Sequence, residues 1–197
     1  RNFMSEKIRV GVVGVGYLGK FHARIYSGMD NVELIGIVDP NEETAKTIAG
    51  ECHCKVFDDI ESLSKEIDAV SIVSPTSLHL ESATPFLQKG VHMMLEKPIA
   101  PSVEEGQKIV EMAESNNAIL QIGHLERFNA GVMALAERVS SPKFIEAHRM
   151  GEFVARATDV DVVSDLMIHD IDIILSLVNS ELTDISANGL SVLTDHI

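Results

Sequence analysis

The sequence predicts an α/β fold, a doubly wound parallel sheet, followed by the first part of an α+β domain. Between residues 8 and 122, short apolar runs alternate with helical patterns, and no hairpin signal separates any two of these runs. The segment Gly14-Val15-Gly16-Tyr17-Leu18-Gly19 joins the first apolar run to the first helical pattern. Alternation of this kind is typical of parallel sheets whose strands are connected by helices.

The expected elements follow from the spacing of apolar residues and from the turn residues between them. Buried strands are expected at residues 8–13, 32–38, 55–57, 69–73, 91–95 and 119–122. Helices are expected at residues 17–28, 42–49, 60–65, 79–89 and 103–116. Gly50 and Gly90 are expected to end two of these helices, because glycine favours the backbone conformation that follows a helix.

The expected domain boundary is Ser140-Ser141-Pro142, which follows a further helix at residues 130–139 and divides the chain into residues 4–140 and 141–197. The second part is expected to contain a strand at 144–150, an irregular loop at 151–161, a helix at 163–178 and strand character at 182–193. One helix and about two strands cannot cover their own hydrophobic faces as an independent domain. We therefore expect the second domain to be incomplete in this chain.

Composition excludes several classes of partner. The 197 residues carry a formal charge of −14, from 16 Lys and Arg against 30 Asp and Glu. This balance repels nucleic acid and anionic membrane surfaces, so a site for a phosphorylated ligand must be locally basic or rich in N–H groups. No apolar run reaches the length of about 18 residues that a membrane span needs. We therefore expect neither a nucleic-acid nor a membrane partner.

The two cysteines, Cys52 and Cys54, flank His53. A zinc site would need further ligands at matching spacing, and none stand nearby in the sequence, so two reduced thiols are the simpler reading and no metal is expected. Reduced thiols without a targeting segment indicate a cytoplasmic protein.

The glycine segment predicts a dinucleotide site. Gly14 would allow a tight turn, Gly16 would let a pyrophosphate approach the backbone, and Gly19 would let helix and strand pack closely. The N–H groups at the start of the helix would then face the phosphates. Asp39 ends the second expected strand, 20 residues beyond Gly19, where a carboxylate can bind the hydroxyls of a ribose.

Two polar loops follow strands of the predicted sheet, at the edge where open parallel sheets bind ligands. They are Ser74-Pro75-Thr76 and Glu96-Lys97-Pro98. Lys97 lies between an apolar strand and a proline that restricts the backbone, so its ammonium group is a candidate for the cleft. Its position alone is equally consistent with a solvated lysine.

A second group of polar residues lies on the helix near the end of the chain. Asp165 and His169 are four residues apart and share a face, and Asp172 lies close to the same face. A carboxylate beside an imidazole can orient it and favour its protonated form, which suits proton transfer near neutral pH. A solvated charge network would show the same spacing. A metal site is disfavoured, since the helix supplies no third ligand at the usual spacing.

These motifs together resemble the glucose-fructose oxidoreductase / inositol dehydrogenase family, often called Gfo/Idh/MocA. The resemblance rests on Gly14-x-Gly16-x-x-Gly19, Glu96-Lys97-Pro98, Gly123-His124 with Arg127-Phe128-Asn129, and Asp165-x-x-x-His169-Asp170-x-Asp172. It implies an N-terminal Rossmann domain, an α+β domain that carries substrate and subunit contacts, and a homo-oligomer such as a dimer or tetramer. Members of the family are longer than this chain.

The resemblance implies catalytic roles for Lys97, Asp165 and His169. His169 would act as general base, Asp165 would orient it, and Lys97 would polarise the reacting oxygen; which of His169 and Lys97 exchanges the proton stays open. The cofactor-binding residues would be Gly14, Gly16, Tyr17, Leu18, Gly19, Asp39, Ser74, Pro75, Thr76, His79, Glu96 and Lys97. Asp39 favours NAD over NADP, because its carboxylate would repel a 2′-phosphate and no arginine follows within residues 40–50.

Within the family, the segments Ser74 to His79, Gly123 to Asn129 and Asp159 to Asp172 look like the branch that oxidises UDP-N-acetylglucosamine at C3, a step toward lipid A. The implied substrate-binding residues are Lys97, Arg127, Phe128, Asn129, Arg149, Arg156, Asp165 and His169. The arginines suit a diphosphate, although each is equally expected to pair with one of the many carboxylates. The alternatives are a dehydrogenase of a free polyol or monosaccharide such as inositol, and a non-catalytic NAD-binding regulator.

Overall fold

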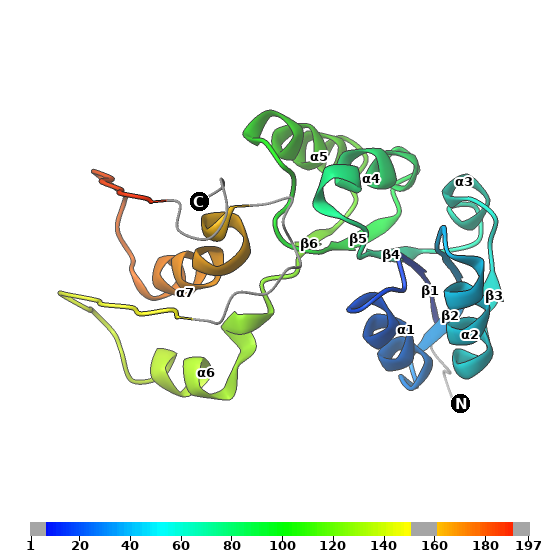
Figure 1. Ribbon diagram of the computed structural model, residues 1–197, viewed down its shortest axis with the longest axis horizontal. Coiled ribbons are helices and arrows are strands. Elements are labelled where there is room, and N and C mark those ends of the chain that lie inside the picture. The colour runs from blue at the N-terminus through cyan, green and yellow to red at the C-terminus, as the bar shows by residue number, and fades with distance from the viewer. Residues whose placement is uncertain (1–6, 151–160, 191–197) are drawn as a thin grey trace, which may run out of the picture. The chain divides into compact units, whose positions relative to one another are not determined.

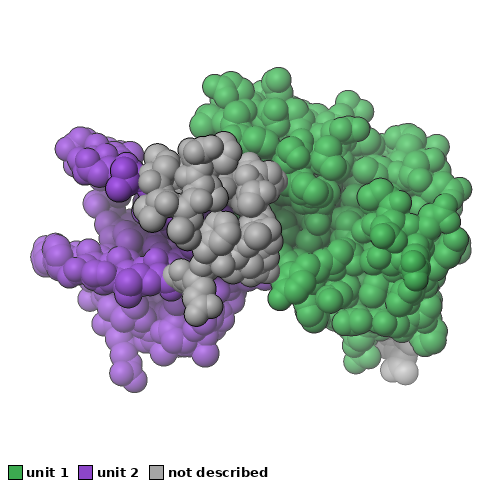
Figure 2. Space-filling model, in the orientation of Figure 1, with its two compact units in different colours: residues 1–123 green, residues 124–197 purple. Residues whose placement is uncertain are grey.

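The computed structural model describes residues 7–150 and 161–190, and the chain divides into two compact units, residues 1–123 and 124–197 (Figure 2). The division falls before His124, earlier in the chain than the expected boundary at Ser140-Ser141-Pro142. Side-chain bonds explain the difference, because Arg127 pairs with Asp172 and so attaches the segment after Gly123 to the second unit.

The first unit contains a six-stranded parallel sheet in the order β3-β2-β1-β4-β5-β6. Its strands are β1 (Ile8–Val13), β2 (Val32–Val38), β3 (Lys55–Val56), β4 (Ala69–Ile72), β5 (His92–Leu95) and β6 (Leu120–Ile122). All five neighbouring pairs are parallel. This is the strand order of a Rossmann fold, and it confirms the predicted doubly wound sheet.

Helices cover both faces of the sheet (Figure 1). The helices α1 (Gly19–Ser27) and α2 (Glu42–Cys52) pack on one face, and α3 (Ile60–Leu63), α4 (His79–Leu87) and α5 (Val103–Ser115) pack on the other. Val12 and Val13 of β1 belong to the two different hydrophobic clusters, as the alternation of side chains along a strand requires. The fully buried Phe86 and Ile37 lie on opposite sides of this sandwich.

The expected end of the second helix is wrong. Gly50 lies within α2, which continues to Cys52 and ends at His53, a residue in the left-handed conformation with φ 56°. Ile48, Ala49 and Cys52 of this helix are buried against the sheet. Packing of that face therefore extends the helix past a glycine that weakens it only locally.

The described part of the second unit is helical or irregular. It contains a 3-10 turn (Leu125–Phe128), α6 (Ala130–Ala136), a π-helical stretch (Val163–Met167) and α7 (Ile168–Leu177). The strand expected at 144–150 is wrong, and the described residues of the expected strand at 182–193 are irregular as well. A strand needs a hydrogen-bonded neighbour, and these residues find none within the described ranges. The loop expected at 151–161 lies almost wholly outside the described residues.

No helix within residues 7–150 and 161–190 has the length and apolar character that crossing a membrane requires.

One ion pair joins β1 to the start of β4, at the edge of the sheet where the strands begin. Asp68 accepts hydrogen bonds from the backbone N–H of Arg9 at 3.0 Å and from its guanidinium group at 2.6 and 3.1 Å. These bonds, first of all those from the side chain of Arg9, lower the pKa of Asp68 below its usual value. The pair therefore stabilises the protein when Asp68 is ionised.

We expect Asp68→Asn to lower the free energy of unfolding at pH 7 by less than about 1 kcal/mol, because both side chains are partly exposed. A lowered pKa in the folded state stabilises above the unfolded pKa of about 3.9, and the effect is lost as the pH falls through the folded pKa. The difference between wild type and variant should thus close on acidification below about pH 4. Urea unfolding at several pH values measures it; a difference that grew in acid would contradict the assignment.

Candidate cofactor and active site

The glycine loop between β1 and α1 is fixed by backbone geometry. Gly14 has φ +81°, and a Cβ atom there would lie 2.8 Å from the carbonyl oxygen of Val73. A Cβ atom on Gly19 would lie 1.8 Å from the carbonyl oxygen of Gly14. Both positions therefore exclude any side chain, in agreement with the roles expected for a tight turn and for close helix–strand packing.

Gly16 differs from the other two glycines of the loop. A Cβ atom on Gly16 would meet no atom of the protein within 4 Å, and the residue is exposed. The fold itself therefore does not require a glycine here. A dinucleotide, however, would need a glycine at this position, because only a residue without a side chain lets a pyrophosphate approach the backbone closely.

The start of α1 is left open to an anion. The helices α2, α3 and α5 begin with side-chain caps from Asn41, Asp59 and Ser102, whereas α1 has no side-chain cap and no acidic residue in its first turn. The ammonium group of Lys20 lies 5.5 Å from the ring of Tyr17, beside the loop. The helix dipole, a first turn without acidic side chains and a nearby cation make this end of α1 a candidate site for the phosphates of a ligand.

Asp39 follows β2 directly and contacts the glycine loop. Its Oδ2 accepts a hydrogen bond from the backbone N–H of Val15 at 2.7 Å, and its Oδ1 accepts one from Asn41 at 2.8 Å. A carboxylate has about four lone-pair sites, so each oxygen keeps capacity for a ribose hydroxyl. The carboxylate is held in place beside the loop that would bind the pyrophosphate.

The strand order brings the remaining predicted loops of the first unit to the same edge. Because β2, β1, β4 and β5 are neighbours, Asp39, the glycine loop, Ser74-Pro75-Thr76 and Glu96-Lys97-Pro98 all follow adjacent strands at their carboxyl ends. The order of strands reverses at β1 and β4, which is where open α/β sheets bind ligands. The sheet therefore collects the predicted cofactor residues in one place.

Individual residues of these loops differ in accessibility. Pro75 is exposed and Ser74 is half-buried, with its hydroxyl 3.4 Å from that of Ser82, while Thr76 begins a 3-10 turn and is buried. Leu18 and Tyr17 are exposed beside the start of α1. Lys97 is half-buried and joined to Pro98 by a cis peptide bond.

Two residues expected among the cofactor contacts are buried in the protein. Glu96 is 7% exposed and His79 is 1% exposed. Oε1 of Glu96 lies 3.4 Å from Nε2 of His22, and the two ring nitrogens of His79 lie 3.0 and 3.2 Å from backbone carbonyl oxygens. Their side chains therefore contact other parts of the first unit.

In the second unit, Asp165 lies in the π-helical stretch and His169 is the second residue of α7. Lys97 belongs to the first unit, so its convergence with Asp165 and His169 stays a prediction. Asp161 lies just before this stretch. Its carboxylate accepts a hydrogen bond from the N–H of Ser164 at 2.7 Å, and its hydrogen bonds with Ser164 lower the pKa of Asp161.

The arginines expected to bind a diphosphate are paired with aspartates of α7. Arg149 donates two hydrogen bonds of 2.8 Å to Asp170, and Arg127 pairs in the same two-pronged way with Asp172. The hydrogen bonds with Arg127 are the main cause of the lowered pKa of Asp172, and His124 and His169 lower it further. The pKa of Asp170 is lowered chiefly by Arg149. Both arginines thus pair with carboxylates, and their binding of a diphosphate stays a prediction.

Other predicted substrate residues have mixed positions. Phe128 is 63% exposed, and Asn129 caps α6 by accepting a hydrogen bond from the N–H of Gly131 at 2.9 Å. Arg156 lies outside the described residues. Nδ1 of His124 is buried and has no hydrogen-bond partner in the described part of the chain, so it is an additional candidate for a ligand contact.

Sequence reasoning missed His22 as a site residue. His22 lies on α1 between Gly19 and Ala23, both buried, and its ring reaches Ser71 and Glu96. The signal that could have identified His22 is a polar residue on the inward face of an amphipathic helix.

The two cysteines give no sign of a disulfide or a metal site among the described residues. Cys52 and Cys54 form no disulfide, and burial, with the neighbouring Cys52, raises the pKa of Cys54 to about 11, so its thiol stays protonated. Among the described residues, no cluster of three His, Cys, Asp or Glu side chains is placed to hold a metal ion.

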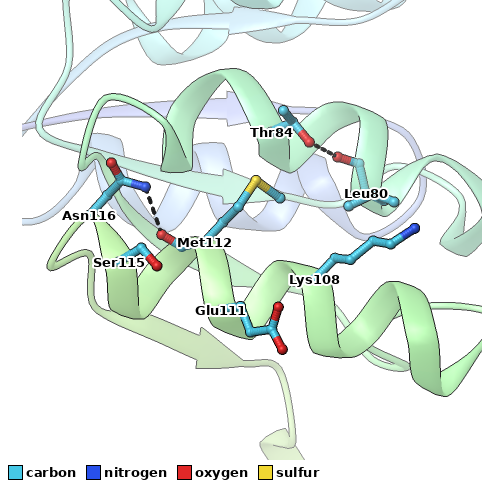
Figure 3. A pocket seen from close by; sticks show the side chains of 7 residues that line it. All are labelled: Leu80, Thr84, Lys108, Glu111, Met112, Ser115 and Asn116. Atoms are coloured by element: carbon cyan, nitrogen blue, oxygen red, sulfur yellow. Dashed lines mark hydrogen bonds between the residues drawn. The ribbon is translucent and has the colours of Figure 1, made fainter.

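A hollow of about 500 Å³ lies between α4 and α5 (Figure 3). Thr84 and Asn116, two of its polar residues, donate hydrogen bonds to the backbone of Leu80 and Met112. None of the residues that line this hollow belongs to the predicted site.

Comparison with known proteins places this geometry in a family. Residues 8–124 match the Gfo/Idh/MocA oxidoreductase family, described by its NAD-binding Rossmann fold. The chain is 40% identical to UDP-N-acetylglucosamine 3-dehydrogenase of Acidithiobacillus ferrooxidans over 95% of its own length and 60% of that relative. It is 30% identical to inositol 2-dehydrogenase of Rhizobium meliloti, again over 95% of the chain and 60% of the relative. The chain thus spans about 60% of the length of these relatives.

Solved structures agree with the sequence matches. The structure of UDP-N-acetylglucosamine 3-dehydrogenase from Acidithiobacillus ferrooxidans superposes with a TM-score of 0.90, covering 96% of this chain and 63% of that one at 40% identity. A putative myo-inositol dehydrogenase from Sinorhizobium meliloti gives a TM-score of 0.74 at 26% identity, covering 89% and 56%. The smaller coverage of each relative supports the expectation that the second domain is incomplete. The chain belongs to the Gfo/Idh/MocA oxidoreductase family and carries its NAD-binding Rossmann domain.

Proposed function

We propose that the protein is an NAD-dependent dehydrogenase that moves hydride between the C3 hydroxyl of UDP-N-acetylglucosamine and the nicotinamide. The observation that carries the substrate is the 40% identity, over nearly the whole chain, with a relative named for that reaction. The open Gly16, the uncapped start of α1 and the anchored Asp39 support the cofactor. The product would be a keto sugar of the kind used toward lipid A.

NAD, when bound, supplies the hydride acceptor at C4 of the nicotinamide. The protein must remove the proton of the hydroxyl as the hydride leaves. In our proposal His169 takes this proton, Asp165 orients the imidazole, and the ammonium of Lys97 polarises the oxygen as it becomes a carbonyl. In the reverse direction the same groups return the proton to the carbonyl oxygen.

The substrate diphosphate would meet Arg127 and Arg149 in their paired state. Each pairing uses Nε and one terminal nitrogen of the guanidinium group. A guanidinium group has five N–H donors, so each arginine retains donors for phosphate oxygens, although its charge is balanced by an aspartate. The two arginines would therefore orient the diphosphate more than attract it. We assign Phe128, Asn129 and Arg156 to the same substrate contacts.

A free polyol is the second candidate, because the inositol 2-dehydrogenase of Rhizobium meliloti is 30% identical over the same share of the chain. A screen of the full-length protein with NAD decides between them. The substrates to compare are UDP-N-acetylglucosamine, UDP-glucose, free N-acetylglucosamine and myo-inositol. Growth of NADH absorbance with UDP-N-acetylglucosamine alone is the expected result; reduction only with myo-inositol would replace the nucleotide sugar by a polyol. NAD binding without reduction by any substrate would indicate a regulator.

Asp39 should set the preference for NAD over NADP. We expect Asp39→Asn to weaken NAD binding by ~10-fold or more, because a hydrogen bond to a charged group contributes about 1.5–3 kcal/mol. The variant should bind NADP better than wild type does, since the negative charge that repels a 2′-phosphate is gone. Fluorescence titration with each cofactor measures both changes. Asp58→Asn, at an exposed carboxylate, is the matched control, and an unchanged ratio of the two affinities would remove Asp39 from the site.

A further inference from the structure

The turn that carries Lys97 lies between two histidines from opposite faces of the sheet. His22 comes from α1 and contacts Glu96, the residue before Lys97. His79 is the first residue of α4 and contacts the backbone of Ile99, two residues after Lys97. Since α1 and α4 cover different faces, the turn is held from both sides.

On the α1 face, the contacts link the half-buried His22 to two buried polar residues. Nδ1 of His22 lies 2.7 Å from the hydroxyl of Ser71, a fully buried residue of β4, and Nε2 lies 3.4 Å from Oε1 of Glu96. The other carboxylate oxygen, Oε2, accepts a hydrogen bond of 3.3 Å from the backbone N–H of Lys97. The orientation of the Glu96 carboxylate therefore bears directly on the peptide group of Lys97.

Gly123 makes room for this carboxylate. A Cβ atom on Gly123 would lie 2.8 Å from Oε1 of Glu96. The N–H of Gly123 also donates a hydrogen bond to the carbonyl of Leu95 at 2.8 Å, which fixes the end of β6 next to the end of β5. The absence of a side chain at Gly123 thus leaves space for the buried carboxylate of Glu96. This packing explains why a glycine stands at the first position of the Gly123-His124 motif.

On the α4 face, His79 connects the turn to the second cofactor loop. Its Nδ1 lies 3.2 Å from the carbonyl oxygen of Ile99, and its Nε2 lies 3.0 Å from the carbonyl oxygen of Ser74. Carbonyl oxygens only accept, so a ring with one hydrogen bonds one of them and the protonated ring bonds both. In either form the fully buried ring fills the space between the two loops.

We propose that His22, Glu96 and His79 are positioning residues that hold the Lys97 turn in register with the phosphate-binding start of α1. The inference rests on the proposed function, in which Lys97 contacts the reacting oxygen. Buried polar groups are costly, and packed apolar side chains would stabilise the same space at least as well. Two buried groups, Glu96 and His79, and the half-buried His22 converge on one turn, where the placement of a reacting group decides the rate.

The test uses the full-length protein and four variants. His22→Ala and His79→Ala each remove the contacts of one histidine, and His22→Gln keeps a polar side chain with an N–H group near Glu96. Leu63→Ala is the control for stability, because Leu63 is fully buried in the core on α3 and its apolar side chain makes no hydrogen bond to the turn. The measurements are kcat, KM for UDP-N-acetylglucosamine, the Kd for NAD, and hydrogen exchange of residues 95–99 without substrate.

We expect kcat to fall ~10–100-fold in His22→Ala and His79→Ala, because a displaced reacting group costs about that much. The Kd for NAD should stay within about threefold, since the residues that bind the cofactor remain. His22→Gln should recover part of the loss, and Leu63→Ala should lower the Tm without lowering kcat. Exchange of residues 95–99 should rise in both histidine variants more than in Leu63→Ala.

Two results would overturn the inference. One is exchange at residues 95–99 that matches the Leu63→Ala control in both histidine variants. The other is a rise in the Kd for NAD in proportion to the loss of turnover, which would make these residues cofactor ligands. If the wild-type protein oxidises no sugar, the proposed function fails, and the exchange measurement alone decides whether the histidines hold the turn.

Discussion

Lys97→Ala should reduce turnover of the nucleotide sugar by ~10²–10³-fold, the usual cost of removing one group that stabilises charge on a reacting oxygen. Lys97 is the middle residue of the turn Glu96-Lys97-Pro98, which follows β5 at the edge of the sheet where the strands end. Truncation removes the ammonium group that polarises the reacting oxygen and leaves the glycine loop and Asp39 intact. The Kd for NAD should therefore change little, and stopped-flow or steady-state absorbance at the NADH band measures the loss of turnover.

Lys108→Ala is the matched control, since Lys108 is an exposed lysine on α5 and lies outside the predicted site. It should leave both turnover and NAD binding unchanged. Turnover of the Lys97 variant within a few-fold of wild type would show that Lys97 takes no part in the chemistry.

Gly19→Ala should abolish NAD binding and destabilise the first unit. The added Cβ atom would lie 1.8 Å from the carbonyl oxygen of Gly14, so α1 or the glycine loop has to move. Steric overpacking of this kind costs about 1–3 kcal/mol or more, and displacement of the loop also removes the anion site. Thermal unfolding and NAD titration of the same sample measure the two effects.

Gly16→Ala separates ligand binding from folding. No protein atom lies within 4 Å of the position that its Cβ atom would take, so the variant should unfold at the wild-type temperature. NAD binding should nevertheless weaken, because the new methyl group stands where a pyrophosphate approaches the backbone. Unchanged affinity in Gly16→Ala would mean that the cofactor does not contact this loop as proposed.

The fold of the first unit was predictable because its signals are local. Each strand is a short apolar run, and Gly14, Gly16 and Gly19 mark a turn whose geometry admits few alternatives. The end of α2 was not predictable in the same way. Gly50 weakens the helix by about 1 kcal/mol at most, and the burial of Cys52 against the sheet outweighs it.

The second unit was less predictable, since a strand depends on its neighbours. Residues 144–150 were expected to form a strand, yet no partner pairs with them within the described residues. The pairing of Arg127 with Asp172 and of Arg149 with Asp170 was equally hidden from the sequence. An acidic chain offers each arginine many carboxylates, and only the fold selects one.

His22 and Glu96 illustrate a different limit. Sequence patterns place Glu96 beside Lys97, but they do not reveal that a histidine 74 positions earlier, on α1, lies against it. Contacts of this range depend on which helix covers which face of the sheet. The positioning role of such residues is therefore visible only after the fold is known.

The start of α1, which has no side-chain cap and no acidic residue in its first turn, has a consequence for protein engineering. A carboxylate introduced at Leu18 would place a negative charge at the positive end of the helix dipole and should raise the melting temperature of the ligand-free protein. The same carboxylate would repel the phosphates of the dinucleotide at the proposed site and lower the affinity for it. In the proposed complex, the phosphates of the dinucleotide would stabilise the positive end of α1, and their binding would raise the melting temperature in place of an acidic side chain.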